Sequence, residues 1–157
     1  IEHDFEITFV GMVKEKEYMG QLQEYILAKG LADTVQFAGF LSGEKLSEEF
    51  EKADIFVSPT LKEGFGLSVL EAMSYGLPVI ASNVGAIPEL VENGVNGLLV
   101  EPENPEMLSR AILEILEKPN LKEQLQKNAI KRSSQFGTID EQFEQFYQAV
   151  ESFSCKR

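Results

Sequence analysis

The stretch from Asp54 to Gly97 restricts the fold of this chain more than any other segment. Its pattern predicts a short apolar strand at Asp54–Ser58, a glycine-containing loop, a helix at Leu67–Tyr75 and a second apolar strand at Leu77–Ser82. A strand, a helix and another strand in this order form a βαβ unit, in which the two strands run parallel. This unit predicts an α/β fold.

The segments on both sides continue the alternation of strands and helices. Further strands are predicted at Glu6–Gly11, which should be buried, at Thr34–Ala38 and at Gly97–Val100. The predicted helices are Lys14–Lys29, Glu44–Lys52, Pro88–Glu92, 104–117, 119–134 and 138–153. We therefore predict a Rossmann-like, doubly wound parallel sheet of five strands, with helices on both faces.

Length and composition are those of a globular protein. The 157 residues suit a single domain with a core of its own, and 43% of them are hydrophobic. The net charge of −12 argues against nucleic acid as a partner. A single cysteine, Cys155, cannot form an internal disulfide, and no apolar run has the length of a membrane span. We expect a cytoplasmic protein.

The loop before the predicted helix at Leu67–Tyr75 combines groups that suit two kinds of ligand. Gly64 and Gly66 let the backbone approach a ligand closely, and the start of a helix offers unpaired N–H groups that favour an anion such as phosphate. Glu63 and Glu71 can accept hydrogen bonds from hydroxyl groups, which sugars have. Phosphate-binding backbone between two such carboxylates indicates a nucleotide-sugar.

Three motifs link this region to a known family. The segments EGFGLSVLE, AMSYGLPVIAS and VGAIPELVENGVNGLLV follow one another between Glu63 and Val100. They closely resemble the C-terminal, donor-binding half of retaining GT-B glycosyltransferases of family 4, or glycosyl transferases group 1. The resemblance extends from about Ile7 to Phe136. It implies an enzyme that moves a sugar from a UDP- or GDP-sugar to a glycan or lipid acceptor, in polysaccharide or glycolipid biosynthesis.

The resemblance also implies roles for the two glutamates. Glu63 is the expected catalytic residue, which approaches the hydroxyls of the transferred sugar, and Glu71 is expected to bind the ribose. Because Glu71 lies in the apolar stretch LSVLEAM, we expect it to be buried and to need such hydroxyl partners. Neither a metal nor a cofactor is implied.

The remaining donor-binding residues are implied in the same way. Backbone N–H groups of Leu67 and Ser68 are expected at the phosphate, and Ser58 forms a wall of the site together with two residues of the following loop. Phe40 would line the nucleobase pocket, although ordinary loop packing explains it equally well. The full set beside the glutamates is Phe40, Leu41, Pro59, Thr60, Gly64, Phe65, Gly66, Leu67 and Ser68.

Parts of the resembled fold are not found in this sequence. Domains of this family have a sixth strand, which would precede Ile7, with an arginine and a nearby lysine that neutralise the donor diphosphate. An N-terminal domain holds the acceptor. We expect the sixth strand with its cations and the N-terminal domain to be missing, so the chain alone should be inactive. Any contact with the inner membrane surface would be made through the missing domain. The strands at Glu6–Gly11 and Asp54–Ser58 should then pair directly, or another chain should fill the gap.

Two other functions remain open. A nucleotide-sugar epimerase shares the GT-B architecture, although the catalytic acids and histidines of that family are not found here. A non-catalytic module that binds a nucleotide-sugar or a partner chain is the second alternative, because the diphosphate cations are missing. If the predicted helix at 138–153 is exposed rather than packed on this domain, self-association through its apolar residues is expected. These residues are Ile139, Phe143, Phe146, Val150 and Phe153.

Overall fold

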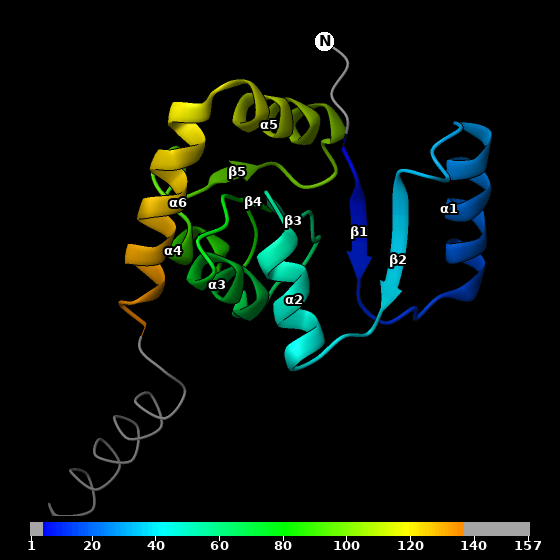
Figure 1. Cartoon of the computed structure of the whole chain (residues 1–157), viewed down its shortest axis with the longest axis horizontal. Helices are drawn as coiled ribbons and strands as arrows, with labels where there is room; N and C mark the ends of the chain where they lie inside the picture. The colour runs from blue at the N-terminus through cyan, green and yellow to red at the C-terminus, as the bar shows by residue number, and fades with distance from the viewer. Residues whose placement is uncertain (1–4, 137–157) are drawn as a thin grey trace, which may run out of the picture. The chain divides into compact units, whose positions relative to one another are not determined.

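The structure, a computed structural model, describes residues 5–136 (Figure 1). It forms two compact units that divide between Glu49 and Phe50, within helix α2 (Glu44–Lys52). The predicted helix at 138–153, and the self-association expected through it, lie outside the described residues.

The first unit is a pair of parallel strands with one helix. Strand β1 (Ile7–Val10) pairs with β2 (Val35–Gly39), and α1 (Lys16–Ala28) connects them. The expectation that β1 is buried is wrong, because all four of its residues are exposed. Within residues 5–136 only β2 pairs with β1, and α1 has a single buried residue, Ile26, so the described part of this unit has too few layers to cover a sheet.

The second unit confirms the predicted βαβ arrangement. Strands β3 (Phe56–Ser58) and β4 (Val79–Ser82) are parallel neighbours joined by α3 (Leu67–Ser74), and β5 (Leu98–Val100) pairs with the other edge of β4. Each strand is shorter than predicted by one to two residues at its start. The central strand β4 is fully buried, as expected for a strand with neighbours on both edges.

The five predicted strands are all present, but they form two sheets rather than one. The α/β class and the parallel strands are confirmed. Direct pairing of β1 with β3 is not found, since β1 is bonded to β2 and β3 to β4.

Three further helices belong to the described part of the second unit. They are α4 (Ile87–Leu90), α5 (Pro105–Glu117) and α6 (Pro119–Ser133). Helix α5 packs on β4 and β5, and α6 packs on both α3 and α5 (Figure 1). A core of buried apolar side chains joins the sheet to α5 and α6. Its members are Ile80, Leu98, Val100, Ala111, Ile115 and Leu125.

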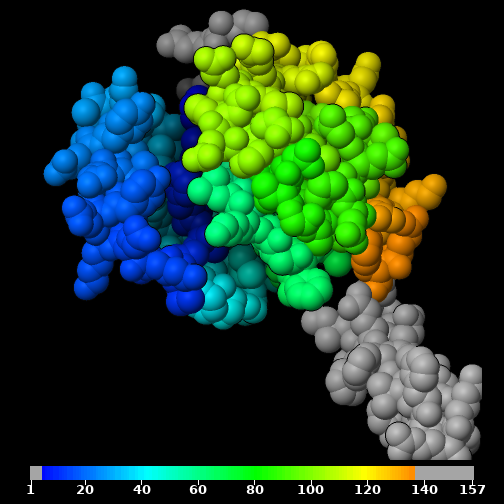
Figure 2. All heavy atoms as spheres, turned by 180° about the vertical axis from the view of Figure 1, so that it is seen from behind, coloured from blue at the N-terminus to red at the C-terminus, as the bar shows by residue number. Residues whose placement is uncertain are grey.

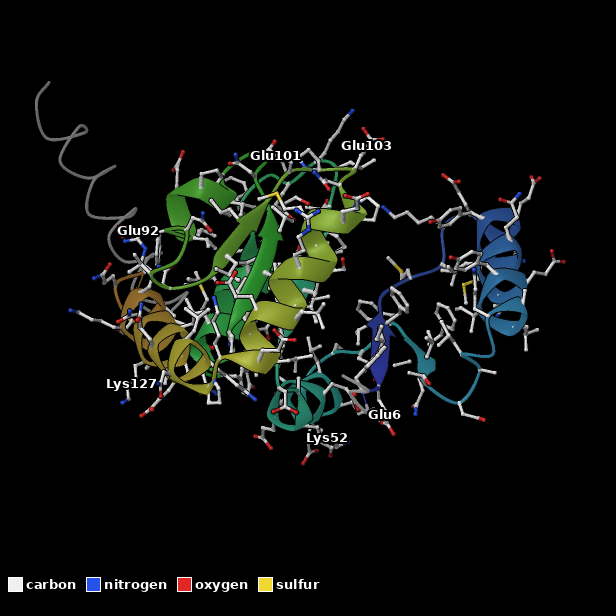
Figure 3. All side chains as sticks on the ribbon, turned by 90° about the horizontal axis from the view of Figure 1, so that it is seen from above. Glu6, Lys52, Glu92, Glu101, Glu103 and Lys127 are labelled. Atoms are coloured by element: carbon white, nitrogen blue, oxygen red, sulfur yellow. The ribbon has the colours of Figure 1, made fainter. Side chains whose placement is uncertain are left out.

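Charged side chains of the second unit lie on its surface. Glu92, Glu101, Glu103 and Lys127 are exposed and point away from the packed interior (Figure 3), and Figure 2 shows the outer face of the second unit. Lys127 donates a hydrogen bond of 2.6 Å to Glu123, and this bond holds the pKa of the Glu123 carboxyl below its usual value. Such exposed pairs contribute little to folding.

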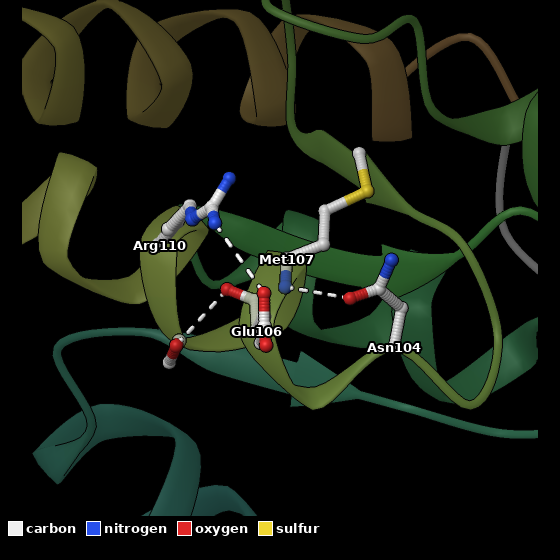
Figure 4. Close-up of polar contacts among 5 residues, drawn as sticks. Asn104, Glu106, Met107 and Arg110 are labelled. Carbon is white, nitrogen blue, oxygen red and sulfur yellow. Dashed lines mark hydrogen bonds and ion pairs between the residues drawn. The ribbon is translucent and has the colours of Figure 1, made fainter.

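Asn104 caps the start of α5. The Asn104 side-chain oxygen accepts a hydrogen bond from the Met107 N–H at 2.9 Å (Figure 4). Pro105 occupies the first helical position, where its missing N–H would have no partner within the helix. This cap fixes where the chain leaves β5 and turns back along the sheet.

A buried asparagine holds the turn between α4 and β5. Asn96, 4% exposed, accepts a hydrogen bond from the Glu92 N–H at 2.8 Å and donates one to the Leu90 carbonyl at 3.2 Å. We expect Asn96→Ala to lower the free energy of unfolding by about 2 kcal/mol, because the half-buried Glu92 N–H loses its partner and the Leu90 carbonyl keeps one partner, Arg132 Nε at 3.3 Å, in place of two. Urea denaturation measures this loss.

An exposed asparagine in the same turn provides the matched control. Asn93 also accepts a backbone hydrogen bond, from the Leu99 N–H at 2.9 Å, but it is exposed, so water can replace it. Asn93→Ala should therefore cost under about 1 kcal/mol. Equal losses for the two variants would show that burial of Asn96 is not what makes it important.

Candidate functional site

The β3–α3 loop (Pro59–Gly66) is shaped by hydrogen bonds within itself. One carboxylate oxygen of Glu63, Oε1, accepts bonds from the N–H groups of Gly64 at 2.9 Å and Gly66 at 3.1 Å. At the other end, the Thr60 hydroxyl donates to the Lys62 carbonyl at 2.8 Å and accepts from the Lys62 N–H at 3.3 Å. The structure thus brings Glu63, Gly64 and Gly66 together at the start of α3.

The two glycines of this loop differ in their surroundings. Gly66 is buried, has φ +71° and would place a β-carbon 2.8 Å from Ile87 Cδ1 and 2.9 Å from Leu90 Cδ1. A side chain at Gly66 would be strained by this backbone conformation, and the ends of the Ile87 and Leu90 side chains would have to move. A β-carbon on Gly64 would meet nothing within 4 Å, which leaves the surface open at that residue.

Helix α3 presents one buried face and one exposed face. Val69, Ala72 and Met73 are fully buried. Glu71 is exposed, so the expectation that it is a buried carboxylate is wrong. The helical repeat explains the difference, because Glu71 follows Leu67 by four residues and shares its exposed face, although its neighbours in the sequence are apolar.

This exposed face combines polar groups with large apolar side chains. Phe65 is 80% exposed and Leu67 is 72% exposed, next to the exposed Ser68 and Glu71. The first N–H groups of α3 have no partner within the helix, as at the start of any α-helix. The surface can therefore offer hydrogen-bond donors, a carboxylate and an apolar contact to one ligand.

The remaining predicted site residues lie before this helix. Pro59 is exposed and Thr60 half-buried, both directly after β3. Phe40 is 67% exposed and Leu41 is half-buried. Both lie in the loop that connects β2 to α2. Their contact with a nucleobase stays a prediction.

Sequence reasoning missed one residue beside the site. Gly85, in the β4–α4 loop (83–86), has φ +54°, and a β-carbon there would overlap the backbone carbonyl oxygen of Glu63. In the sequence, Gly85 stands out only as part of the segment VGAIPELVENGVNGLLV. The VGAIPE motif was a signal that could have singled it out, but the motif does not say what the glycine touches.

Two kinds of site are not seen in the part of the chain that the structure describes. Residues 5–136 contain no group of three or more histidine, cysteine, aspartate or glutamate side chains that could hold a metal ion. None of the helices within them has the length and apolar character needed to cross a membrane.

Comparison with known proteins decides the family. The sequence profile of the family described as Glycosyl transferases group 1 matches residues 1–132. The chain belongs to this family. This match confirms the resemblance inferred from the motifs. The fold of the chain is also similar to that of GT-B glycosyltransferases.

Curated relatives from the group 1 family are longer than this chain. A D-inositol 3-phosphate glycosyltransferase of Streptomyces griseus is 36% identical over 116 residues, which are 74% of this chain and 25% of that protein. An uncharacterised glycosyltransferase of Methanocaldococcus jannaschii is 32% identical over 129 residues, or 82% of this chain and 32% of that protein. The chain thus spans about a third of such relatives or less.

Solved structures show the same fold. HepE of Anabaena in complex with UDP superimposes with a TM-score of 0.86 and 29% identity, covering 94% of this chain and 41% of that one. A further structure of HepE contains UDP-glucose. A glycosyltransferase of Rickettsia africae has a TM-score of 0.87 at 23% identity, with 98% of this chain and 41% of that one covered, and supports the fold alone.

Proposed function

We propose that this chain is the donor-binding part of a retaining glycosyltransferase that uses a UDP- or GDP-sugar. The observation that supports it best is the exposed surface at the start of α3. There the first-turn N–H groups, the Glu63 carboxylate and the Glu71 carboxylate lie along one loop and one helix face. Membership of the group 1 family and the likeness to HepE, which binds UDP and UDP-glucose, support the same ligand class.

The N–H groups of Leu67 and Ser68 would bind the phosphate. Both residues are exposed in the first turn of α3, at the positive end of the helix dipole. The N–H groups of Gly64 and Gly66 are already bonded to Glu63, so they orient that carboxylate instead. The N–H groups of Gly64, Gly66, Leu67 and Ser68 would then each have one partner.

The two carboxylates would divide the hydroxyl groups of the ligand between them. Glu71, four residues into the exposed face of α3, would accept hydrogen bonds from the ribose. Glu63, at the end of the loop, would accept them from the transferred sugar. Phe65 and Leu67 would lose water from their apolar surfaces when the ligand binds.

In the proposed reaction, the bond between the sugar's anomeric carbon and the diphosphate oxygen breaks. A new bond forms from that carbon to an acceptor hydroxyl oxygen, with retention of configuration, and the hydroxyl proton is released. Negative charge develops on the departing diphosphate. The N–H groups of Leu67 and Ser68 would stabilise this charge, which makes them part of the catalytic electrostatics.

The acceptor side of the site is proposed to come from elsewhere. The match with this chain covers a third or less of the length of the relatives. This supports an additional domain, which would hold a glycan or lipid acceptor. We propose that residues 1–157 do not turn over alone, and that the cations facing the diphosphate belong to segments outside them. A cytoplasmic location, at the inner membrane surface through that domain, is part of the same proposal.

Titration of the isotope-labelled chain with UDP, followed by amide NMR signals, tests the proposal. We expect shifts concentrated at residues 64–71, and none along α5, because the phosphate and ribose bind at the start of α3. Uridine, which has no phosphate, should shift these signals far less, and GDP in place of UDP identifies the base. Shifts that avoid residues 64–71, or no binding of either nucleotide at millimolar concentration, would contradict the proposal.

A further inference from the structure

We propose that Gly85 is a positioning residue for the donor site. It sets where the main chain of Glu63 lies, and through Glu63 it sets the shape of the β3–α3 loop. The inference rests on the proposed function, because it concerns the loop that would receive the nucleotide-sugar. Gly85 itself would not touch the ligand.

The contact between Gly85 and Glu63 joins one main chain to another. A β-carbon on Gly85 would overlap the Glu63 carbonyl oxygen and would lie 2.9 Å from its carbonyl carbon and 3.6 Å from its Cα. No flexible side chain is present there that could turn aside. An added methyl group must therefore displace the backbone of one of the two loops.

The β4–α4 loop is the one that cannot easily give way. The Asn83 N–H donates to the Val100 carbonyl at 2.8 Å, which ties the loop to β5. Val84 N–H donates to the Ser82 carbonyl at 2.9 Å, and Ile87 N–H donates to the Val84 carbonyl at 3.1 Å. Gly85 lies between these bonds. Its backbone is therefore fixed to the buried sheet.

The same segment supports the β3–α3 loop at a second place. Ile87 and Leu90 of α4 lie against Gly66, where a β-carbon would come within 2.9 Å of both side chains. Gly85 contacts the loop at Glu63, three residues earlier. The loop is thus held at both Glu63 and Gly66 by one continuous segment, residues 85–90.

The position of Glu63 determines the polar geometry of the loop. Its Oε1 atom reaches the N–H groups of Gly64 and Gly66 at 2.9 and 3.1 Å only while its own main chain stays in place. Moving that main chain outwards would break one or both bonds and release the carboxylate. It would also shift the turn from which α3 begins, and with it the N–H groups proposed to bind phosphate.

A second glycine separates this effect from simple backbone strain. Gly94 has φ +77°, so an alanine there is strained as at Gly85, where φ is +54°. A β-carbon on Gly94 would meet nothing within 4 Å. Both glycines belong to the second unit. Gly94→Ala therefore reproduces the strain of Gly85→Ala without the displacement of Glu63.

The test compares the two variants in the full 157-residue chain. Thermal unfolding, amide NMR signals without ligand and UDP affinity by calorimetry are measured for each. We expect Gly94→Ala to bind UDP with unchanged affinity. Gly85→Ala should bind UDP at least about tenfold more weakly, because the binding groups are misplaced. Before any ligand is added, the Gly64 and Gly66 signals should move in Gly85→Ala and stay in place in Gly94→Ala.

Three outcomes count against the proposal. Equal affinity losses in both variants would assign the effect to strain, and unmoved Gly64 and Gly66 signals in Gly85→Ala would show that Glu63 is not displaced. If Gly85→Ala fails to fold while Gly94→Ala folds, the contact supports the whole unit rather than the loop. If the unaltered chain does not bind UDP, the proposed function fails, and the ligand-free amide signals alone decide the role of Gly85.

Discussion

Glu71→Gln is expected to weaken the binding of both UDP and UDP-glucose, by roughly five- to 150-fold. The proposed partner of Glu71 is the ribose, which both ligands contain. Glutamine keeps the size of the side chain but replaces a charged acceptor with a neutral amide. Since Glu71 is exposed in the unliganded chain, the substitution should leave the free energy of unfolding nearly unchanged. Calorimetry at low salt measures the affinities.

Glu63→Gln should behave differently with the same two ligands. Its proposed partner is the transferred sugar, so binding of UDP-glucose should fall while binding of UDP is retained. Glu106→Gln, on the exposed surface of α5, is the control for loss of one negative charge and should change neither affinity. Its ion pair with Arg110 spans 3.4 Å and is exposed, so the fold should tolerate its removal.

The pattern across these variants separates the roles of the glutamates. Equal losses for the two ligands in Glu63→Gln would overturn its assignment to the sugar. Unchanged binding in Glu71→Gln would mean that Glu71 is only a surface residue of α3. A chain that binds both ligands but, when joined to an acceptor domain, transfers no sugar would favour a non-catalytic binding module.

Gly97→Ala is expected to lower the free energy of unfolding by about 3 kcal/mol, the second large effect. Gly97 is buried just before β5, and a β-carbon there would lie 2.8 Å from Val91 Cγ1 and 2.9 Å from the Val79 carbonyl oxygen. Val79 belongs to the fully buried β4, so its carbonyl cannot retreat without disturbing the centre of the sheet. Urea denaturation measures the loss.

A double-mutant cycle with Val91→Ala shows whether overlap is the cause. Val91→Ala removes the Cγ1 atom that the new methyl group would meet, so the double variant should be more stable than the sum of the two single losses predicts, by about 1 kcal/mol. The same cycle with Gly94→Ala should show no such coupling, because nothing lies within 4 Å of a β-carbon at Gly94. Additive losses in the Gly97 cycle would show that the contact with Val91 is not a cause, and would leave the Val79 carbonyl as the steric obstacle.

Much of the fold could be predicted from local signals. The order of strands and helices, the βαβ unit and the cap at Asn104 all follow from interactions within a few residues, such as apolar periodicity and the bonding of a side chain to a nearby N–H. The family also follows from the sequence, because its motifs are contiguous segments. The positions of Glu63 and Gly66 just before α3 could also be predicted from the local sequence.

The prediction failed where a residue's environment depends on distant segments. The apolar sequence of β1 suggested burial, but burial requires neighbours on both faces and both edges, and β1 has only β2 as a paired strand. The apolar sequence around Glu71 suggested the same, but the orientation of α3 on its sheet places Glu71 on the exposed side.

The glycines show most clearly what the sequence determined by itself and what the tertiary structure decided. In the sequence, Gly85, Gly94 and Gly97 all belong to the segment VGAIPELVENGVNGLLV, and nothing in that segment distinguishes their surroundings. The folded chain shows that the three glycines have different surroundings. A β-carbon would meet open space at Gly94, the Val79 carbonyl at Gly97 and the Glu63 carbonyl at Gly85. Because glycine has no side chain, its role at a given position depends on the atoms that distant parts of the chain place around it.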